Sequence, residues 1–418
     1  MQFVAAPADK PPGPAPEVLS GPWPLRVARR LSAQAFALAR PHLPAVLLWG
    51  TGLVAKGATF VFGFKVGRCG GVEALGAMAA FYLAVWIVGS TASLGLPDWA
   101  LFRAARDRAR DGRPSAQLGV GHGLFLVLSG AAYLLLFAAA PALGGVGELG
   151  GFVRWLALAS AFQHFGVYGI SCLRGLGRPA AEMAANGGSA LILLAGSLWA
   201  PGLAELGGVI AVANLSFFGA GLFAVVREPR LRPALRRAGQ VVPQAAGSLV
   251  YLALGLEAYL LGNADLLIAR LLLSPAEVGL LQGATVVVRG ASAGPWLLAT
   301  LSLHRLQAAG GAAPDGSNGR HLGPAVALAA AVIVGGWLVL PFVAWGYGIE
   351  LSEIELPAKV ALGTTPLGFA AVMLLPIAAL RHSLATVVRA GAALALAALA
   401  GLLLAPALGI VGATLAGA

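Results

Sequence analysis

Residues 245–303 read AAGSLVYLALGLEAYLLGNADLLIARLLLSPAEVGLLQGATVVVRGASAGPWLLATLSL. This stretch predicts two apolar helices joined by a tight turn at Leu273-Ser274-Pro275. Each helix is long enough to cross a bilayer, because about 20 apolar residues span ~30 Å of hydrocarbon. An ionisable group at membrane depth costs roughly 2.5–3.5 kcal/mol on insertion scales, so such a group indicates function. The two helices contain four of these groups, namely Glu257, Asp265, Arg270 and Arg289.

The composition of the whole chain is that of an all-α, multi-pass membrane protein. The 418 residues are 58% hydrophobic and only 11% charged, whereas soluble chains have about 25% charged residues. The net charge of +11 is explained by cytoplasmic loops that collect Lys and Arg, so it predicts no nucleic-acid partner. Neither the two cysteines, Cys69 and Cys172, nor the histidines have metal-ligand or redox spacing, so no metal or cofactor is predicted.

The hydropathy pattern predicts about eleven full spans and a truncated twelfth, which begins at Gly409 and stops at Ala418. Residues 1–42 are predicted to form a cytoplasmic tail, in which 25–40 is either an interfacial basic helix or a solvated linker. The remaining chain is divided into a bundle over 43–226, a basic cytoplasmic linker over 227–244 and a second bundle over 245–418. The full spans are placed near 44–67, 74–96, 118–142, 152–173, 181–201, 206–226, 245–272, 276–301, 323–347, 358–380 and 384–405.

The distribution of basic residues orients these spans. With the N-terminus in the cytoplasm and alternating helices, most of the 28 Lys and Arg residues fall on the cytoplasmic side. This bias predicts a protein of the cell inner membrane with a cytoplasmic N-terminus. Lys65 and Arg68, at the outer end of the first helix, are expected to extend to the lipid headgroups. The other basic residues at outer ends are Arg154, Arg270 and Lys359.

The two bundles resemble each other in sequence. Residues 65–85 resemble residues 269–288, and placing Gly76 on Gly279 gives an offset of 203. Residues 172–201 likewise resemble residues 379–406, with Arg174 placed on Arg381. Repeats with an even number of spans keep the same orientation and are related by an axis along the membrane normal. We therefore expect two pseudo-symmetric six-helix bundles with a substrate path between them.

These features resemble a known family. The motifs are ADLLIARLLLSPAEVGL (264–280), LRGLGRP (173–179), the glycine-rich turn after the first helix and the basic loop 227–243. Together with the two halves they resemble the oligosaccharide flippases of polysaccharide biosynthesis. That family belongs to the multidrug/oligosaccharidyl-lipid/polysaccharide exporter superfamily, with the lipid II flippases and the multidrug-and-toxin extruders. The resemblance covers residues 43–418.

The resemblance implies a transporter of lipid-linked oligosaccharides and not an enzyme. Its substrate would be an undecaprenyl-diphosphate-linked oligosaccharide, moved from the cytoplasmic to the outer leaflet for synthesis of lipopolysaccharide or exopolysaccharide. A cation-coupled multidrug extruder of the same superfamily is the alternative, with proton or sodium coupling through Glu257 or Asp265. A glycosyltransferase or polymerase is disfavoured, because the longest outer loop, near 348–357, is short.

Counting residues from the turns gives the depth of the charges. At 1.5 Å per helical residue, Glu257, Arg289 and Lys56 all lie near the midplane. A diphosphate must be shielded from hydrocarbon, and cationic side chains do this by charge-assisted hydrogen bonds. We therefore predict that Lys56 and Arg289 bind substrate, with Glu257 as their counter-ion or a proton-coupling site. The alternative is that Glu257 and Arg289 simply neutralise each other.

The remaining two charges of the pair lie nearer the outer side. Asp265 is expected to pair with Arg270 or to form part of an outer gate. Aromatic residues crowd the first two helices, where most are expected to face lipid or the membrane interface and some to stack on sugars. Gly63 and Gly67 form a GxxxG pair, which permits close helix packing.

Overall fold

The computed structural model describes residues 43–144, 147–245, 249–291, 322–380 and 384–417. The chain divides into two compact units, Met1–Leu47 and Leu48–Ala418, and the second unit contains both predicted bundles except residues 43–47. The expected helix at 25–40, residues 292–301 of the eighth expected span and Arg381 lie outside the described residues. The division into bundles at 227–244 stays a prediction.

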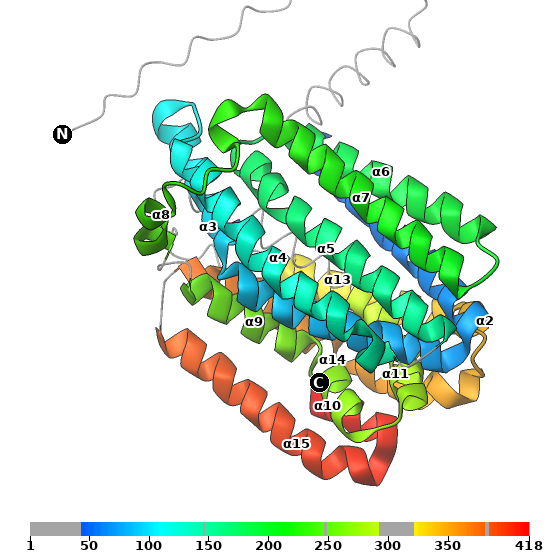
Figure 1. Cartoon of the computed structure of the whole chain (residues 1–418). Coiled ribbons are helices and arrows are strands. Elements are labelled where there is room, and N and C mark those ends of the chain that lie inside the picture. Colours follow the sequence, from blue (N-terminus) through cyan, green and yellow to red (C-terminus); the bar gives the residue numbers. More distant parts are fainter. Residues whose placement is uncertain (1–42, 145–146, 246–248, 292–321, 381–383, 418) are drawn as a thin grey trace, which may run out of the picture. The chain divides into compact units, whose positions relative to one another are not determined.

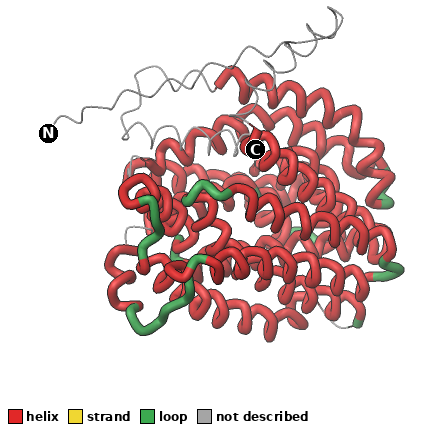
Figure 2. The backbone as a smooth tube through the Cα atoms, turned by 90° about the horizontal axis from the view of Figure 1, so that it is seen from above, coloured by secondary structure: helices red, strands yellow, loops and turns green. Residues whose placement is uncertain are grey.

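The described residues form helices and loops without strands, which confirms the all-α class (Figures 1 and 2). Among them, six helices are long and apolar enough to cross a membrane. The α-helices of the first part are α2 (Leu43–Ser93), α3 (Leu96–Asp111), α4 (Ala116–Gly144), α5 (Glu148–Gly175), α6 (Pro179–Trp199) and α7 (Leu203–Arg227). The linker holds a 3-10 turn, η1 (Pro229–Leu231), and α8 (Ala238–Ala245). The second part has α9 (Leu249–Gly262), α10 (Ala264–Leu272), α11 (Pro275–Ala291), α13 (Leu322–Tyr347), α14 (Leu351–Leu380) and α15 (Leu384–Gly417).

The first two predicted spans form one long element, α2, which bends at Gly71. Gly71 has φ 69° and ψ −172°, a backbone conformation that is open to glycine and strained for other residues. The last element repeats this arrangement at Gly409, with φ 58° and ψ −135°. After Gly409 the chain folds back on the preceding helix. A Cβ on Gly412 would lie only 2.1 Å from the Leu404 carbonyl oxygen, which shows how closely the two segments approach.

The seventh predicted span, 245–272, is wrong as a single helix. The structure divides it at Asn263 into α9 and α10. The side-chain amide of Asn263 donates to the Tyr259 carbonyl (Nδ2–O 2.9 Å), and the Asn263 backbone leaves the helical region at φ −135° and ψ 22°. Gly262 precedes Asn263. Glycine favours a break because its backbone is flexible, and asparagine favours one because its side chain bonds to nearby backbone groups.

Helix α3 was not predicted, because its mean hydropathy is too low for a membrane span. Its apolar side is nevertheless regular: Leu96, Trp99, Ala100 and Ala104 are buried at helical spacing. The polar side carries exposed arginines, and Arg103 is paired with Asp107 at 3.0 Å. A 3.6-residue periodicity of this kind is typical of a helix that packs on one face only.

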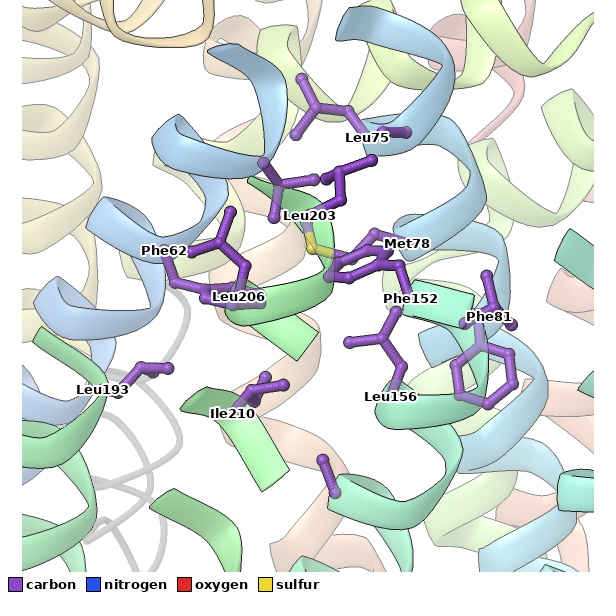
Figure 3. Close-up of a cluster of buried hydrophobic side chains, with 14 of the residues drawn as sticks. Phe62, Leu75, Met78, Phe81, Phe152, Leu156, Leu193, Leu203, Leu206 and Ile210 are labelled. Carbon is purple, nitrogen blue, oxygen red and sulfur yellow. The ribbon is translucent and has the colours of Figure 1, made fainter. Parts of the chain in front are cut away.

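A cluster of buried apolar side chains connects α2 to the helices around it (Figure 3). Phe62 and Leu75 of α2 are fully buried against Phe152 of α5 and Leu206 of α7. The same cluster extends to Tyr347 of α13, so α2 contributes to the packing of both parts of the chain. Because α2 packs against helices of both parts, a site between the two parts would include residues of α2.

Candidate functional site

The two sequence repeats cross each other at a pair of glycines. A Cβ on Gly76 of α2 would lie 1.9 Å from the Pro275 carbonyl oxygen, and a Cβ on Gly279 of α11 would lie 1.9 Å from the Val72 carbonyl oxygen. The two contacts are reciprocal, because both Gly76 with Gly279 and Val72 with Pro275 are separated by the repeat offset of 203. Residues from two repeats that contact in this exchanged manner lie on a local two-fold axis. The contact therefore supports the repeat alignment.

A second contact between the repeats lies near this crossing, between α2 and the end of α13. A Cβ on Gly67 would lie 2.8 Å from the Tyr347 carbonyl oxygen, and one on Gly63 would lie 3.1 Å from the Tyr347 hydroxyl. Arg68 donates to the carbonyl oxygens of Gly346 (3.1 Å) and Trp345 (3.0 Å), and its guanidinium lies 4.2 Å from the centre of the Trp345 ring. Cations are favoured at the carboxyl end of a helix, where the last carbonyls lack partners.

The prediction that Arg68 extends to the lipid headgroups was therefore incomplete. Its side chain binds the end of α13 across the two repeats and does more than extend to lipid. The aromatic residues of α2 also differ from the prediction that most face lipid. Phe62 and Phe81 are buried, while Phe60 and Phe64 contact the Tyr347 ring with centroid distances of 6.1 and 4.8 Å.

A third contact joins the repeats farther from the turns. The rings of Trp86 on α2 and Tyr259 on α9 stack with centroids 3.6 Å apart and planes at 8°. By the offset of 203, Trp86 corresponds to Arg289 and Tyr259 corresponds to Lys56. The local two-fold axis thus relates the observed stack to a contact between positions 289 and 56. It predicts that Lys56 and Arg289 lie at one level on the two sides of the same interface.

Lys56 is exposed and makes no hydrogen bond or ion pair with the residues that the structure describes. On α2 it shares a helical face with Gly52, Phe60, Gly63 and Gly67, since these residues recur at spacings of three and four. Packing on this face changes along the helix: Gly63 and Gly67 are in close contact with Tyr347, whereas a Cβ on Gly52 would meet none of the described residues within 4 Å. Lys56 therefore lies where the close contact between α2 and α13 has ended.

Arg289 has the opposite environment. Its guanidinium donates to the Asp265 carboxylate (Nη2–Oδ2 2.6 Å) and to the Gln282 side chain (Nη1–Oε1 2.6 Å). The side chains of Arg289 and Asp265 are only 19% and 13% exposed. Asp265 also accepts from the Leu266 backbone amide (2.8 Å). The long arginine side chain reaches back along α11, in the direction in which helical side chains point.

The expected pairing of the charges needs correction. Asp265 pairs with Arg289, and Arg270 is exposed with no ion pair to any described residue. The side chain of Glu257 lies outside the described residues, so its part as counter-ion, coupling site or partner of Arg289 stays a prediction. Asp265 is further covered by the end of α15, because a Cβ on Gly417 would lie 2.6 Å from the Asp265 amide nitrogen. Together these contacts make Asp265 a packed counter-ion within the second repeat.

The sequence contained a signal for two of these contacts, Arg289 with Asp265 and Trp86 with Tyr259. Counting residues from the turns did not use that signal. Depth alone assigned Asp265 to an outer level, yet the length of the arginine side chain brings Arg289 to it. For the Trp86–Tyr259 stack the signal is the repeat alignment, in which each aromatic residue occupies the position of a cation in the other repeat. The Arg68 contact has no such signal, because nothing in the sequence shows which helix end lies beside Arg68. Among the described residues, no group of His, Cys, Asp and Glu side chains fits a metal ion.

Comparison with solved structures identifies the fold. The chain has the fold of MOP superfamily transporters. A MATE multidrug transporter, DinF-BH, matches with a TM-score of 0.61 and 16% identity over 88% of this chain and 91% of that chain. The lipid II flippase MurJ, in an inward closed conformation, matches with a TM-score of 0.59 and 10% identity over 90% and 84% of the two chains. A MOP superfamily transporter from Pyrococcus furiosus matches with a TM-score of 0.55 and 17% identity over 90% and 91%.

No protein-family model matches the chain, and no curated protein matches it. At sequence identities of 10–17%, these structural matches show a shared fold but not a shared function. The fold and its apolar helices identify a multi-pass membrane protein. The function of this chain must therefore be inferred from its own side chains.

Proposed function

We propose that the protein flips a lipid-diphosphate-linked oligosaccharide from the cytoplasmic to the outer leaflet by alternating access. The observation that carries this proposal is that each repeat holds a cation, Lys56 or Arg289, and the repeat relation predicts that the two lie at one level. One of them, Lys56, is exposed with no ion pair or hydrogen bond to the described residues. A diphosphate crossing the membrane needs charge-assisted hydrogen bonds from such groups.

In this mechanism Lys56 contacts the diphosphate first, because it is exposed. Arg289 lies on the other repeat, where Asp265 and Gln282 fix the direction of its guanidinium. A guanidinium has five N–H donors, and a phosphate oxygen accepts charge-assisted hydrogen bonds from donors of this kind. Binding one ligand between the two repeats then favours the arrangement in which both repeats contact it.

The contacts near the turns give this movement a fixed point. The Gly76–Gly279 crossing brings two backbones together without side chains between them. Small residues at such crossings allow helices to approach closely in lipid. We infer that the repeats tilt about this crossing while Lys56 and Arg289 become accessible from one side and then the other. The Arg68 bonds to α13 would break and form in each cycle.

The second candidate is a cation-coupled multidrug extruder. The observation in its favour is the packed Asp265 carboxylate, since an intramembrane acid is a natural proton or sodium site. The exposed Lys56 argues against it, because a lysine at this level disfavours cationic drugs by like-charge repulsion.

Two assays distinguish the candidates. In reconstituted vesicles, the wild-type chain should move an undecaprenyl-diphosphate-linked oligosaccharide between leaflets, and a cell that lacks the protein should accumulate cytoplasm-facing lipid-linked repeat units. Normal outward delivery of glycan in that cell, combined with increased sensitivity to cationic drugs, would replace the flippase with the extruder. Normal delivery with unchanged drug sensitivity would contradict both.

A further inference from the structure

A cavity of about 680 Å3 lies between α4 and the linker that follows α7. It is within the ~300–1,000 Å3 range of small-ligand sites. It is separate from the Lys56–Arg289 level, because its lining comes from Gly123, Leu126 and Val127 of α4 and from residues 233–237 of the linker. The proposed transport function makes no use of it.

The linker is fixed against α4 by two glycines one helical turn apart. A Cβ on Gly119 would lie 2.2 Å from the Arg232 carbonyl oxygen, and one on Gly123 would lie 3.0 Å from the Leu235 side chain. The backbone amide of Ala234 donates to the Gly119 carbonyl (2.9 Å). The linker wall of the cavity is therefore held in place by backbone contacts.

The lining of the cavity combines charged and apolar side chains. Arg236 and Arg237 belong to it, and their guanidinium groups bond to none of the residues that the structure describes. Arg230 and Arg232 differ, because each donates to a carbonyl oxygen, of Pro114 and Val226 respectively. Leu126, Val127 and Leu235 line the rest of the cavity, and Val127 and Leu235 are about half exposed, at 53% and 52%.

From Val127 an apolar strip continues along α4. Val127, Ala131, Leu134, Leu135 and Ala138 recur at spacings of three and four, and all are exposed. Leu134 and Leu135 are each 72% exposed, which is typical of side chains that face lipid tails. The surface thus presents two cations on the linker and an exposed apolar strip on α4 that begins at the cavity.

We propose that this cavity binds one anionic glycerophospholipid of the membrane. The phosphate would accept hydrogen bonds from Arg236 and Arg237, and an acyl chain would follow Leu126, Val127 and the strip on α4. Basic pockets beside transmembrane helices bind anionic lipid headgroups by the same combination of charge and apolar contact. Because the linker connects the two predicted bundles, a lipid at this place would hold the linker to α4.

The test uses the purified full chain in detergent and native mass spectrometry, with dioleoylphosphatidylglycerol and dioleoylphosphatidylcholine as probes. We expect selective retention of one phosphatidylglycerol. Arg236→Gln/Arg237→Gln should weaken its binding roughly 10- to 30-fold, given the contribution of each basic residue near an anionic headgroup. Val127→Trp, which fills the apolar wall and keeps both arginines, should weaken it as well. Arg110→Gln/Arg113→Gln removes two exposed charges away from the cavity and should leave binding unchanged.

Each other outcome overturns the proposal. Equal retention of the two lipids, or equal weakening in the Arg110/Arg113 control, would mean general attraction to anionic lipid. Wild-type retention in Val127→Trp would remove the cavity from the binding site. Displacement of the lipid by millimolar inorganic phosphate would indicate a site for free phosphate. If the arginine double variant fails to fold, Arg236→Lys/Arg237→Lys must retain at least half of the wild-type selectivity.

Discussion

The two hairpins that correspond by the offset of 203 differ in the environment of their cationic residues. The first, within α2, carries Lys56 exposed and without a bond to the described residues. The second, α9 to α11, is broken at Asn263, and Arg289 is bound by Asp265 and Gln282. Both hairpins share the glycine crossing, so the repeat sets the backbone positions while single residues set the chemistry. One repeat pairs its cation with its own acidic residue, whereas the cation of the other repeat is exposed.

The largest expected effect comes from removing the local neutralisation. Asp265→Ala removes a carboxylate that accepts from the part-buried Arg289 guanidinium, which costs about 3 kcal/mol of unfolding free energy. Unfolding in detergent by denaturant measures the loss. Glu355→Ala is the matched control, since it removes the exposed Lys359–Glu355 pair (2.7 Å, side chains 42% and 44% exposed) and costs less than ~1 kcal/mol. Equal losses in the two variants would contradict the account of the second hairpin.

A smaller effect tests what the hairpins share. Gly76→Ala and Gly279→Ala each place a Cβ 1.9 Å from a carbonyl oxygen, so each should cost about 1–3 kcal/mol through overpacking. Because the contacts are reciprocal, the two losses should agree within about 0.5 kcal/mol. Gly208→Ala, in α7 with nothing within 4 Å, should be neutral or should stabilise by up to ~1 kcal/mol. Loss at only one of the crossing glycines would contradict the two-fold relation.

The smallest effect concerns the aromatic stack between the hairpins. Trp86→Leu and Tyr259→Leu, with the double variant, form a thermodynamic cycle whose coupling energy should be about 0.5–1.5 kcal/mol. The cycle is measured by the same denaturant unfolding. A coupling energy of zero would remove the contact from which the level of Lys56 and Arg289 is inferred.

The sequence predicted the backbone features of the two hairpins better than the contacts of their side chains. The turn at Leu273–Pro275, the bend near Gly71 and the alignment of Gly76 with Gly279 all follow from apolar run lengths and glycine positions. The break at Asn263 was missed, because weak helix formers such as Gly262 and Asn263 inside a long apolar run are often tolerated by packing. Its cause, a side-chain bond to the preceding turn, depends on the rotamer and not on composition.

The partner of Arg289 was missed for a different reason. Counting residues gives depth along a helix, but it gives neither the direction of a side chain nor its reach. Arg289 lies 24 positions after Asp265 in the chain, and their guanidinium and carboxylate groups nevertheless meet at 2.6 Å. The place of Lys56 on α2 was accessible from sequence, because the repeat alignment relates it to Tyr259. Its exposure required the surrounding helices to be positioned.

The most direct test of the central claim is the binding of undecaprenyl diphosphate to the purified chain, with undecaprenol as the uncharged reference. Lys56→Gln should weaken diphosphate binding roughly 10- to 100-fold, as expected for one charge-assisted hydrogen bond, and should leave undecaprenol binding unchanged. Lys56→Arg should retain most of the affinity, and Lys65→Gln, one charge lost on the same helix, should behave as wild type. If Lys56→Gln binds undecaprenyl diphosphate as tightly as the wild-type chain, Lys56 is not part of a diphosphate site.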